Sequence, residues 1–303
     1  MPSGITRTGN AASAESPPPE KGGRKPGALR FRVLSAVLFL PPFVFITKVG
    51  DLPFFLLVLA IALLATVESY RLFRSRGVSP LLPFGLLAAV ALLVILREGR
   101  ADRAFFFLVL FFLIALLSLL PRKGPAPFSR VAGAMFILVY AAGLPGFLVL
   151  LRELPRTALS SYGYGEGASF VYLLFLTAWG CDTGAYTVGR LFGRRKLAPS
   201  ISPKKTVEGA VGGLLFAVAG AVAARAFLVE GLSLADAAFL GVGAGVLGQA
   251  GDLVESALKR EADVKDSARL IPGHGGVLDR FDSLFLAAPF VYGYLRFALG
   301  GGS

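Results

Sequence analysis

The sequence has few of the residues that form disulfides and zinc sites. It contains one cysteine, Cys181, and one histidine, His274, among 303 residues. A single cysteine excludes an internal disulfide, and one histidine with one cysteine cannot supply the nitrogen and sulfur ligands of a zinc site. Cys181 lies within an apolar run, so we expect it to be a small buried thiol.

Charged residues are also scarce. They make up 17% of the chain, whereas hydrophobic residues make up 55%; a typical soluble domain is about 25% charged. The hydrophobic residues form continuous blocks of roughly 20 residues, the length of a membrane-spanning helix. Strands of a membrane barrel would instead alternate in polarity over about 10 residues. We therefore expect an all-α polytopic membrane protein, and we exclude a soluble two-domain enzyme and a disordered chain.

The hydrophobic blocks divide the chain into three regions. Residues 1–30 have no apolar periodicity and are predicted to be a disordered basic tail. Residues 31–160 hold five spans with almost no ionisable residue at depth and are predicted to be a transmembrane scaffold. Residues 161–303 hold four spans with several acidic residues, so we expect the functional site there. The predicted transmembrane helices number about nine, at approximately 31–49, 52–69, 80–96, 104–120, 131–151, 168–188, 207–229, 234–255 and 281–299.

Positive charge predicts the orientation in the membrane. The chain has 31 Lys and Arg against 19 Asp and Glu, a net charge of +12. Most basic residues between the predicted spans fall on the side of the N-terminal tail, which also holds two long polar loops before the seventh and ninth spans. By the positive-inside rule, the tail and these loops are cytoplasmic and the C-terminus is outside. We thus expect a multi-pass protein of the cell (inner) membrane, whose last four spans form a polar cavity facing the cytoplasm. Its positive charge suits anionic lipid and a phosphate ligand better than nucleic acid.

The loop SISPKKTVE, residues 200–208, has the pattern of a helix start. Ser202 is a favourable N-cap, and Pro203 suits the first helical position. Lys204 and Lys205 then fall in the first turn, where cations are unfavourable unless an anion is bound. The loop predicts either a phosphate site or an ordinary cap followed by cytoplasmic lysines.

Polar residues at the end of the eighth span share one helical face. Asp252, Glu255, Ser256 and Lys259 are spaced i, i+3, i+4 and i+7. A carboxylate in this setting can bind a hard cation, or it can pair with the lysine at the end of the helix.

The stretch from Ser256 to Leu284 combines a glycine-rich turn with charged residues of both signs. Asp279 comes three residues after the sequence Pro-Gly-His-Gly-Gly, and Asp282 lies one turn further on, at the start of the last span. Together with Asp252 of the eighth span, they place carboxylates on two helices with basic residues between them. This arrangement suits Mg²⁺ bridging a polyphosphate. The alternative is a solvated cytoplasmic loop, in which His274 would be a structural turn residue.

Two further features lie within spans. Asp182 shares a helical face with Tyr186 and Gly189, and it can face the same cavity or pair with Arg190 or a neighbouring helix. Two glycine pairs, four residues apart on spans seven and eight, predict close helix packing. These pairs are Gly209 with Gly213 and Gly241 with Gly245.

Several interrupted motifs lie between roughly residues 169 and 283. They are Trp179 through Arg190, Ser202-Pro203-Lys204-Lys205-Thr206, Gly251-Asp252, and Ser256-x-x-Lys259-Arg260, Lys265-Asp266 and Pro272-Gly273-His274-Gly275-Gly276-x-x-Asp279-Arg280-x-Asp282. In these motifs the chain resembles the phosphatidate cytidylyltransferase (CDP-diacylglycerol synthase) family.

The resemblance implies an activity, a metal and a set of site residues. The reaction would convert CTP and phosphatidic acid to CDP-diacylglycerol and pyrophosphate with Mg²⁺; a second metal or a monovalent cation, and a homodimer, are left open. Metal ligands would be Asp252 and Asp279, with Asp282 as a further candidate, and catalysis would also involve Lys259 and Asp266. The substrate-binding residues it implies are Asp182, Ser202, Lys204, Lys205, Thr206, Arg260, Lys265, His274 and Arg280.

Three other functions fit part of the pattern. A CTP-dependent lipid kinase would share the nucleotide site but transfer the γ-phosphate. A cation transporter could use Asp182, Asp252 and Asp279 as an ion path, but it would not explain the lysines or the glycine-rich turn. A non-catalytic relative would bind CTP without turnover.

Overall fold

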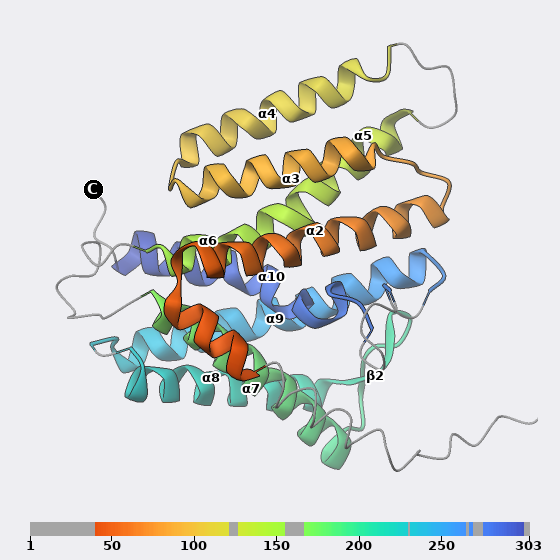
Figure 1. Cartoon of the computed structure of the whole chain (residues 1–303). Helices are drawn as coiled ribbons and strands as arrows, with labels where there is room; N and C mark the ends of the chain where they lie inside the picture. The colour runs from red at the N-terminus through yellow and green to blue at the C-terminus, as the bar shows by residue number, and fades with distance from the viewer. Residues whose placement is uncertain are drawn as a thin grey trace, which may run out of the picture.

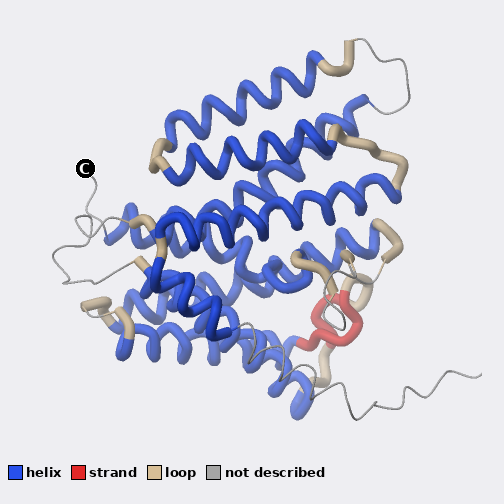
Figure 2. Tube along the Cα trace, viewed as in Figure 1, coloured by secondary structure: helices blue, strands red, loops and turns tan. Residues whose placement is uncertain are grey.

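The computed structural model describes residues 40–120, 127–154, 167–229, 231–264, 267–268 and 275–299. Helices make up almost all of this part of the chain (Figure 2). They lie in successive layers, from α4 and α3 at one edge, through α2 and α6, to α9, α8 and α7 at the other (Figure 1). The elements are a helix at Leu40–Val49, α2 (Asp51–Ser75), α3 (Leu82–Arg97), α4 (Ala101–Leu117), α5 (Pro127–Ile137), η1 (Leu138–Gly143), α6 (Leu144–Arg152), α7 (Ala168–Phe192), β1 (Lys196–Ala198), β2 (Ser202–Thr206), α8 (Val207–Phe227), α9 (Leu234–Glu261), α10 (Leu278–Gly293) and η3 (Tyr294–Leu299).

Each predicted hydrophobic segment contains a helix in the part that the structure describes. The fifth segment consists of α5, the π-helical turn η1 and α6, and the ninth consists of α10 and η3. Several helices extend beyond the predicted spans at one end, and α9 continues to Glu261. Within the described ranges, four helices are long and apolar enough to cross a membrane: Asp51–Ser75, Phe128–Arg152, Val207–Phe227 and Leu234–Glu261. The total of nine spans stays a prediction.

The outermost helix, α4, shows the surface expected of a protein surrounded by lipid. Its large side chains Phe105, Phe106 and Leu117 are exposed, whereas Phe111 is buried and stacks on Phe84 of α3, with ring centroids 4.9 Å apart. An apolar surface of this extent is unfavourable in water and is normal in a bilayer.

Helices α7, α8 and α9 approach one another at glycines, as the two glycine pairs predicted. A Cβ on Gly213 of α8 would lie 3.0 Å from the Cys181 carbonyl oxygen of α7, and one on Gly209 would lie 2.8 Å from that of Ala185. On α9, a Cβ on Gly241 would lie 2.6 Å from the Cα of Val218. Larger side chains would separate the helices at these positions. Cys181 is buried at this contact, as expected.

The predicted helix start at Ser202 is wrong. Residues Ser202–Thr206 form strand β2, which pairs antiparallel with β1 in a short hairpin with a register shift. The residue before a proline is biased toward extended conformation, so Ser202 continues a strand. Helix α8 begins at Val207 instead, with Thr206 as its N-cap, because the Thr206 Oγ1 accepts a hydrogen bond from the Gly209 amide at 3.1 Å.

Two arginines at helix ends, Arg97 of α3 and Arg152 of α6, hold neighbouring helices together. Arg97 forms an ion pair with Asp51, and Arg152 donates to the Thr47 carbonyl at 2.8 Å. The first contact joins the end of α3 to the beginning of α2, and the second joins the end of α6 to the end of the helix Leu40–Val49.

Candidate functional site

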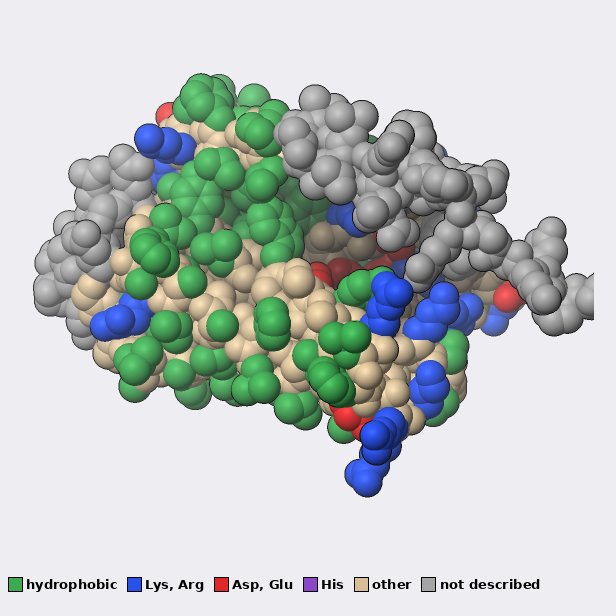
Figure 3. Space-filling view, turned by 90° about the horizontal axis from the view of Figure 1, so that it is seen from below, with side chains coloured by type: hydrophobic (Ala, Val, Ile, Leu, Met, Phe, Trp, Pro, Cys, Tyr) green, Lys and Arg blue, Asp and Glu red, His purple; other side chains and the backbone are tan. Residues whose placement is uncertain are grey.

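Most of the predicted site residues in the described ranges lie at one end of the helices. Helices α2, α7 and α9 end there, α8 and α10 begin there, and the β1–β2 hairpin projects beside them (Figure 1). A space-filling view shows acidic side chains recessed in a hollow, between a hydrophobic surface and a group of Lys and Arg side chains (Figure 3). Asp252 near the end of α9 and Asp279 in the first turn of α10 lie at this end of the helices, whereas Arg225 and Asp236 lie at the other.

Asp279, in the first turn of α10, is the centre of an ion network. Its Oδ1 lies 2.5 Å from the Lys259 Nζ of α9, and Lys259 also lies 2.5 Å from Glu255 Oε2. The Asp279 Oδ2 accepts hydrogen bonds from the Ser267 amide at 3.1 Å, the Ser267 hydroxyl at 2.9 Å and the Gly276 amide at 2.8 Å. Both oxygens of this carboxylate thus have protein partners, and Lys259 is held between two acidic residues.

Asp252 has a different lysine partner. Its Oδ2 lies 2.7 Å from the Lys205 Nζ of strand β2, and its Oδ1 accepts a long hydrogen bond of 3.4 Å from Ser256. In a strand, successive side chains point to opposite faces; accordingly Lys205 is half-buried against Asp252, while Lys204 is exposed. The predicted polar face of α9 is confirmed, because Asp252–Ser256 and Glu255–Lys259 each interact along it.

Three carboxylates from three helices lie within electrostatic range of one another. Asp182 of α7 and Asp282 of α10 each lie within electrostatic range of Asp252, and Lys205 acts on Asp182 as well. Asp182 does not pair with Arg190, whose guanidinium donates to the Tyr186 hydroxyl at 3.2 Å. In the part of the chain that the structure describes, no three His, Cys, Asp or Glu side chains are close enough together to form a complete metal site.

Glu68 is a site residue that sequence reasoning missed. It belongs to α2, in the predicted scaffold, and it is fully buried. Its carboxylate accepts hydrogen bonds from the Val277 and Leu278 amides at 2.8 and 2.9 Å and from the Ser267 hydroxyl at 2.8 Å. A lone acidic residue near the end of an apolar run was the signal that could have identified it.

Tyr140 of η1 is a second residue from the predicted scaffold that reaches the site. Its ring packs edge-on against Phe285 of α10, and its hydroxyl is buried without a hydrogen-bond partner in the described residues. Glu255 and Asp282 lie within electrostatic range of this hydroxyl. A π-helical turn often occurs at a functional position, and here it presents Tyr140 to the carboxylates.

The other predicted residues have varied positions. Arg260 donates to the Ile201 carbonyl at 3.3 Å, which joins α9 to the hairpin turn, and Arg280 is exposed on α10. Ser202 lies at the beginning of β2, and Thr206 caps α8. Lys265, Asp266 and His274 lie outside the described residues.

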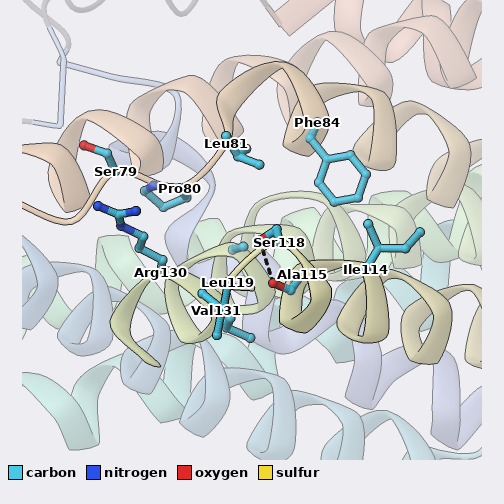
Figure 4. Close-up of a pocket in the computed structure, with 11 residues that line it drawn as sticks. Ser79, Pro80, Leu81, Phe84, Ile114, Ala115, Ser118, Leu119, Arg130 and Val131 are labelled. Carbon is cyan, nitrogen blue, oxygen red and sulfur yellow. Dashed lines mark hydrogen bonds between the residues drawn. The ribbon is translucent and has the colours of Figure 1, made fainter. Parts of the chain in front are cut away.

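A separate cavity of about 140 Å³ lies between α3, α4 and α5 (Figure 4). Its lining is mainly apolar and includes Phe84 and Ile114, with Arg130 beside Ser79 and Pro80. Ser118 at its edge donates to the Ala115 carbonyl of its own helix at 2.6 Å. None of the predicted site residues lines this cavity.

Comparison with known proteins supports the resemblance drawn from the motifs. A family model described as "Cytidylyltransferase family" matches residues 30–298. The chain belongs to this family. Over 274 residues it is 34% identical to the phosphatidate cytidylyltransferase of Bacillus subtilis (strain 168), a match that covers 87% of this chain and 96% of that protein.

Two staphylococcal relatives with the same name are similar over nearly the same length. The protein of Staphylococcus saprophyticus is 34% identical over 268 residues, and that of Staphylococcus aureus (strain COL) is 31% identical over 269 residues. Each match covers 87% of this chain and 97% of the relative. The family match therefore includes α2 and η1, which contribute Glu68 and Tyr140, as well as the region that carries the motifs.

Proposed function

We propose that this chain transfers the cytidylyl group of CTP to phosphatidic acid, giving CDP-diacylglycerol and pyrophosphate, at the hollow formed by α7, α9, α10 and the hairpin. The observation that carries the proposal is the paired arrangement of Lys205 with Asp252 and Lys259 with Asp279, in a chain whose relatives over nearly full length are phosphatidate cytidylyltransferases. Lysines held by acidic residues supply positive charge in a defined position, as binding of a triphosphate requires.

The reaction needs positioning more than proton transfer. An oxygen of the lipid phosphate attacks the α-phosphorus of CTP, and the bond from that phosphorus to the bridging oxygen of the β-phosphate breaks. The lipid phosphate is already an anion, so it needs no strong base. Negative charge accumulates on the phosphoryl oxygens and on the leaving pyrophosphate, and neutralising it is the main task of the site. Lys205, Lys259 and Arg260 are the described residues we assign to this task.

Mg²⁺ is the metal we propose for this site. It binds through one or two carboxylates together with phosphates and water, so a complete cage of protein ligands is not needed. Asp252 and Asp282 are the carboxylates best suited to hold it. Asp279 pairs with Lys259 at one oxygen and accepts three hydrogen bonds at the other, whereas the Oδ1 of Asp252 has only a long hydrogen bond of 3.4 Å from Ser256. Bound Mg²⁺ would neutralise phosphate charge; a second metal or a monovalent cation is not needed for this assignment.

We further propose that the hollow faces the cytoplasm, where CTP is made. The support is the excess of Lys and Arg in the loops at this end of the helices. The N-terminal tail would then be cytoplasmic and the C-terminus outside. Phosphatidic acid would reach the site from within the bilayer, with only its phosphate leaving the apolar region.

Two positions of label in CTP test the reaction directly. Purified protein in detergent would be incubated with phosphatidic acid, Mg²⁺ and CTP labelled with ³²P at either the α- or the γ-phosphate. We expect label in the lipid extract only from α-labelled CTP, with γ-label recovered in pyrophosphate. Transfer of γ-label to lipid would identify a lipid kinase, and binding of CTP without transfer of either label would identify a non-catalytic relative.

A matched pair of variants connects the activity to the hollow. Lys259→Met removes the charge held between Glu255 and Asp279, and we expect it to lose at least 100-fold in kcat. Arg103 lies on the distant helix α4 and forms an exposed ion pair with Glu98, the residue after α3. Arg103→Gln removes this ion pair and should leave the rate unchanged. Equal rates in both variants would contradict the proposed site.

A further inference from the structure

Glu68 joins the two halves of the molecule through hydrogen bonds across the chain. Its Oε1 accepts from the Val277 amide, and its Oε2 accepts from the Leu278 amide and the Ser267 hydroxyl. All three donors belong to the region with the predicted site, about 200 residues further along the chain. Its side chain is 0% exposed, so these donors replace water entirely.

The two amides are the ones that a helix start leaves without partners. The first N–H groups of a helix have no carbonyl acceptor within it, and a negative charge nearby is favourable. The N-cap residue of α10 is Val277, which makes no side-chain capping bond. Glu68 therefore supplies, from α2, the cap that the sequence of α10 does not contain.

Ser267 extends this contact to the ion network. Its hydroxyl lies 2.8 Å from Glu68 Oε2 and 2.9 Å from Asp279 Oδ2, so its single hydrogen is shared between two carboxylates. Asp279 in turn holds Lys259. A Cβ on Gly276 would meet both the Ser267 hydroxyl and the Glu68 carboxylate, so the loop lies directly on Glu68.

We infer that Glu68 is a positioning residue for the proposed cytidylyl transfer: it fixes the first turn of α10 and Ser267, so that Asp279 holds Lys259 in the hollow. Glu68 itself lies beneath the network and contacts no substrate. The inference rests on the proposed function, and it assigns to α2 a part in the reaction that its apolar sequence does not suggest.

Replacing Glu68 with glutamine tests this role at nearly constant volume. Glutamine has one acceptor oxygen, and its NH₂ group faces a donor, so at least one of the two amides loses its acceptor. We expect kcat for CDP-diacylglycerol formation to fall at least tenfold, with the KM for CTP changed less than threefold. Ser69→Ala is the matched control, because Ser69 is the next residue on α2 and its buried hydroxyl has no partner in the described residues; its rates should stay within twofold of the parent protein.

A double-mutant cycle separates positioning from general destabilisation. Ser267→Ala removes the bridge and leaves both amides capped, and we expect at least a fivefold fall in kcat. In that background, Glu68→Gln should lower kcat by less than half as much, in log units, as it does alone. Independent effects that multiply would overturn the inference.

Three other outcomes have clear meanings. A lower unfolding temperature for Glu68→Gln, with unchanged kcat per folded molecule, would show a structural role only and overturn the inference. If Glu68→Gln does not fold, full activity of Ser267→Ala would overturn it as well. A parent protein that forms no liponucleotide would refute the proposed function, a result distinct from these.

Discussion

Replacing Asp279 with asparagine separates two roles that the Asp279 carboxylate can have: it can hold Lys259 in place, or it can be a metal ligand. One oxygen pairs with Lys259 at 2.5 Å, and the other accepts three hydrogen bonds from Ser267 and Gly276. Asparagine keeps the size but has no charge and only one acceptor oxygen. Either Lys259 or the loop donors must therefore lose their partner.

The structure gives the size of the effect. The Asp279 and Lys259 side chains are 12% and 15% exposed, so the pair is largely shielded from solvent. Removing one partner of a buried pair costs about 3–5 kcal/mol. Because Lys259 keeps its pair with Glu255, also at 2.5 Å, we expect a cost below this range, about 2 kcal/mol. The same loss in the transition state would reduce kcat about 30-fold or more.

A magnesium titration of CDP-diacylglycerol formation, with thermal unfolding in detergent, measures both roles. If Asp279 acts by holding Lys259, Asp279→Asn lowers kcat and leaves the half-saturating Mg²⁺ concentration within twofold. If Asp279 is a metal ligand, that concentration rises severalfold. Asp263→Asn is the control, because Asp263 is exposed and its φ of 55° is one that asparagine tolerates. Near-parental kcat with an unchanged unfolding temperature would refute the reasoning.

Four further outcomes are expected. Lys205→Met and Asp252→Asn should each lower kcat at least tenfold, and less than additively in combination because the two side chains pair at 2.7 Å; independent effects in a double-mutant cycle would contradict this. Thr206→Ala should destabilise the protein by about 1 kcal/mol through loss of the α8 cap, seen as a lower unfolding temperature. Gly213→Leu should reduce the yield of folded protein on size-exclusion chromatography, since α7 leaves no room for its side chain. Chelation of divalent cations should stop turnover, and added Mg²⁺ should restore it; full activity in excess chelator would exclude the metal.

The helices could be predicted from sequence because a bilayer imposes a strong and simple rule. Backbone groups in lipid must be hydrogen-bonded within the segment, so long apolar blocks become helices. The polar face of α9 followed from helical spacing alone, and Asp252 and Lys259 lie on it as expected. The glycine contacts of α8 also followed, since close approach needs no knowledge of the partner helix.

The hairpin could not be predicted with the same rules. Ser-Pro is compatible with both a helix start and an extended strand, and the choice depends on pairing with residues 196–198. Two lysines directly after the proline were an argument against a helix start, because the first turn repels cations. Thr206, which is four residues after Ser202 and is followed by Glu208 in the first turn, was the better signal for the start of α8.

Glu68 and the partners of Asp279 depend on contacts between distant segments. A sequence places Glu68 near the end of a span, but it does not show which helix start that span will meet. Likewise, the residue type of Asp279 predicts a metal ligand, which stays a prediction, but it does not show that Lys259 and Ser267 also contact this carboxylate. The residue type predicts which groups a side chain can bind, and the fold determines which of them lie within contact distance.

The tight seam along α7 and α8 restricts how a lipid can arrive. From Gly209 to Gly220, α8 lies against backbone carbonyls of α7, and at the hollow Gln249 of α9 donates to the Ala210 carbonyl of α8 at 3.0 Å. An acyl chain is far wider than the space at these contacts. A lipid would therefore enter the hollow from a side other than the contact between α7 and α8. Bulky residues introduced along this contact would impair packing of the helices and would not block lipid entry.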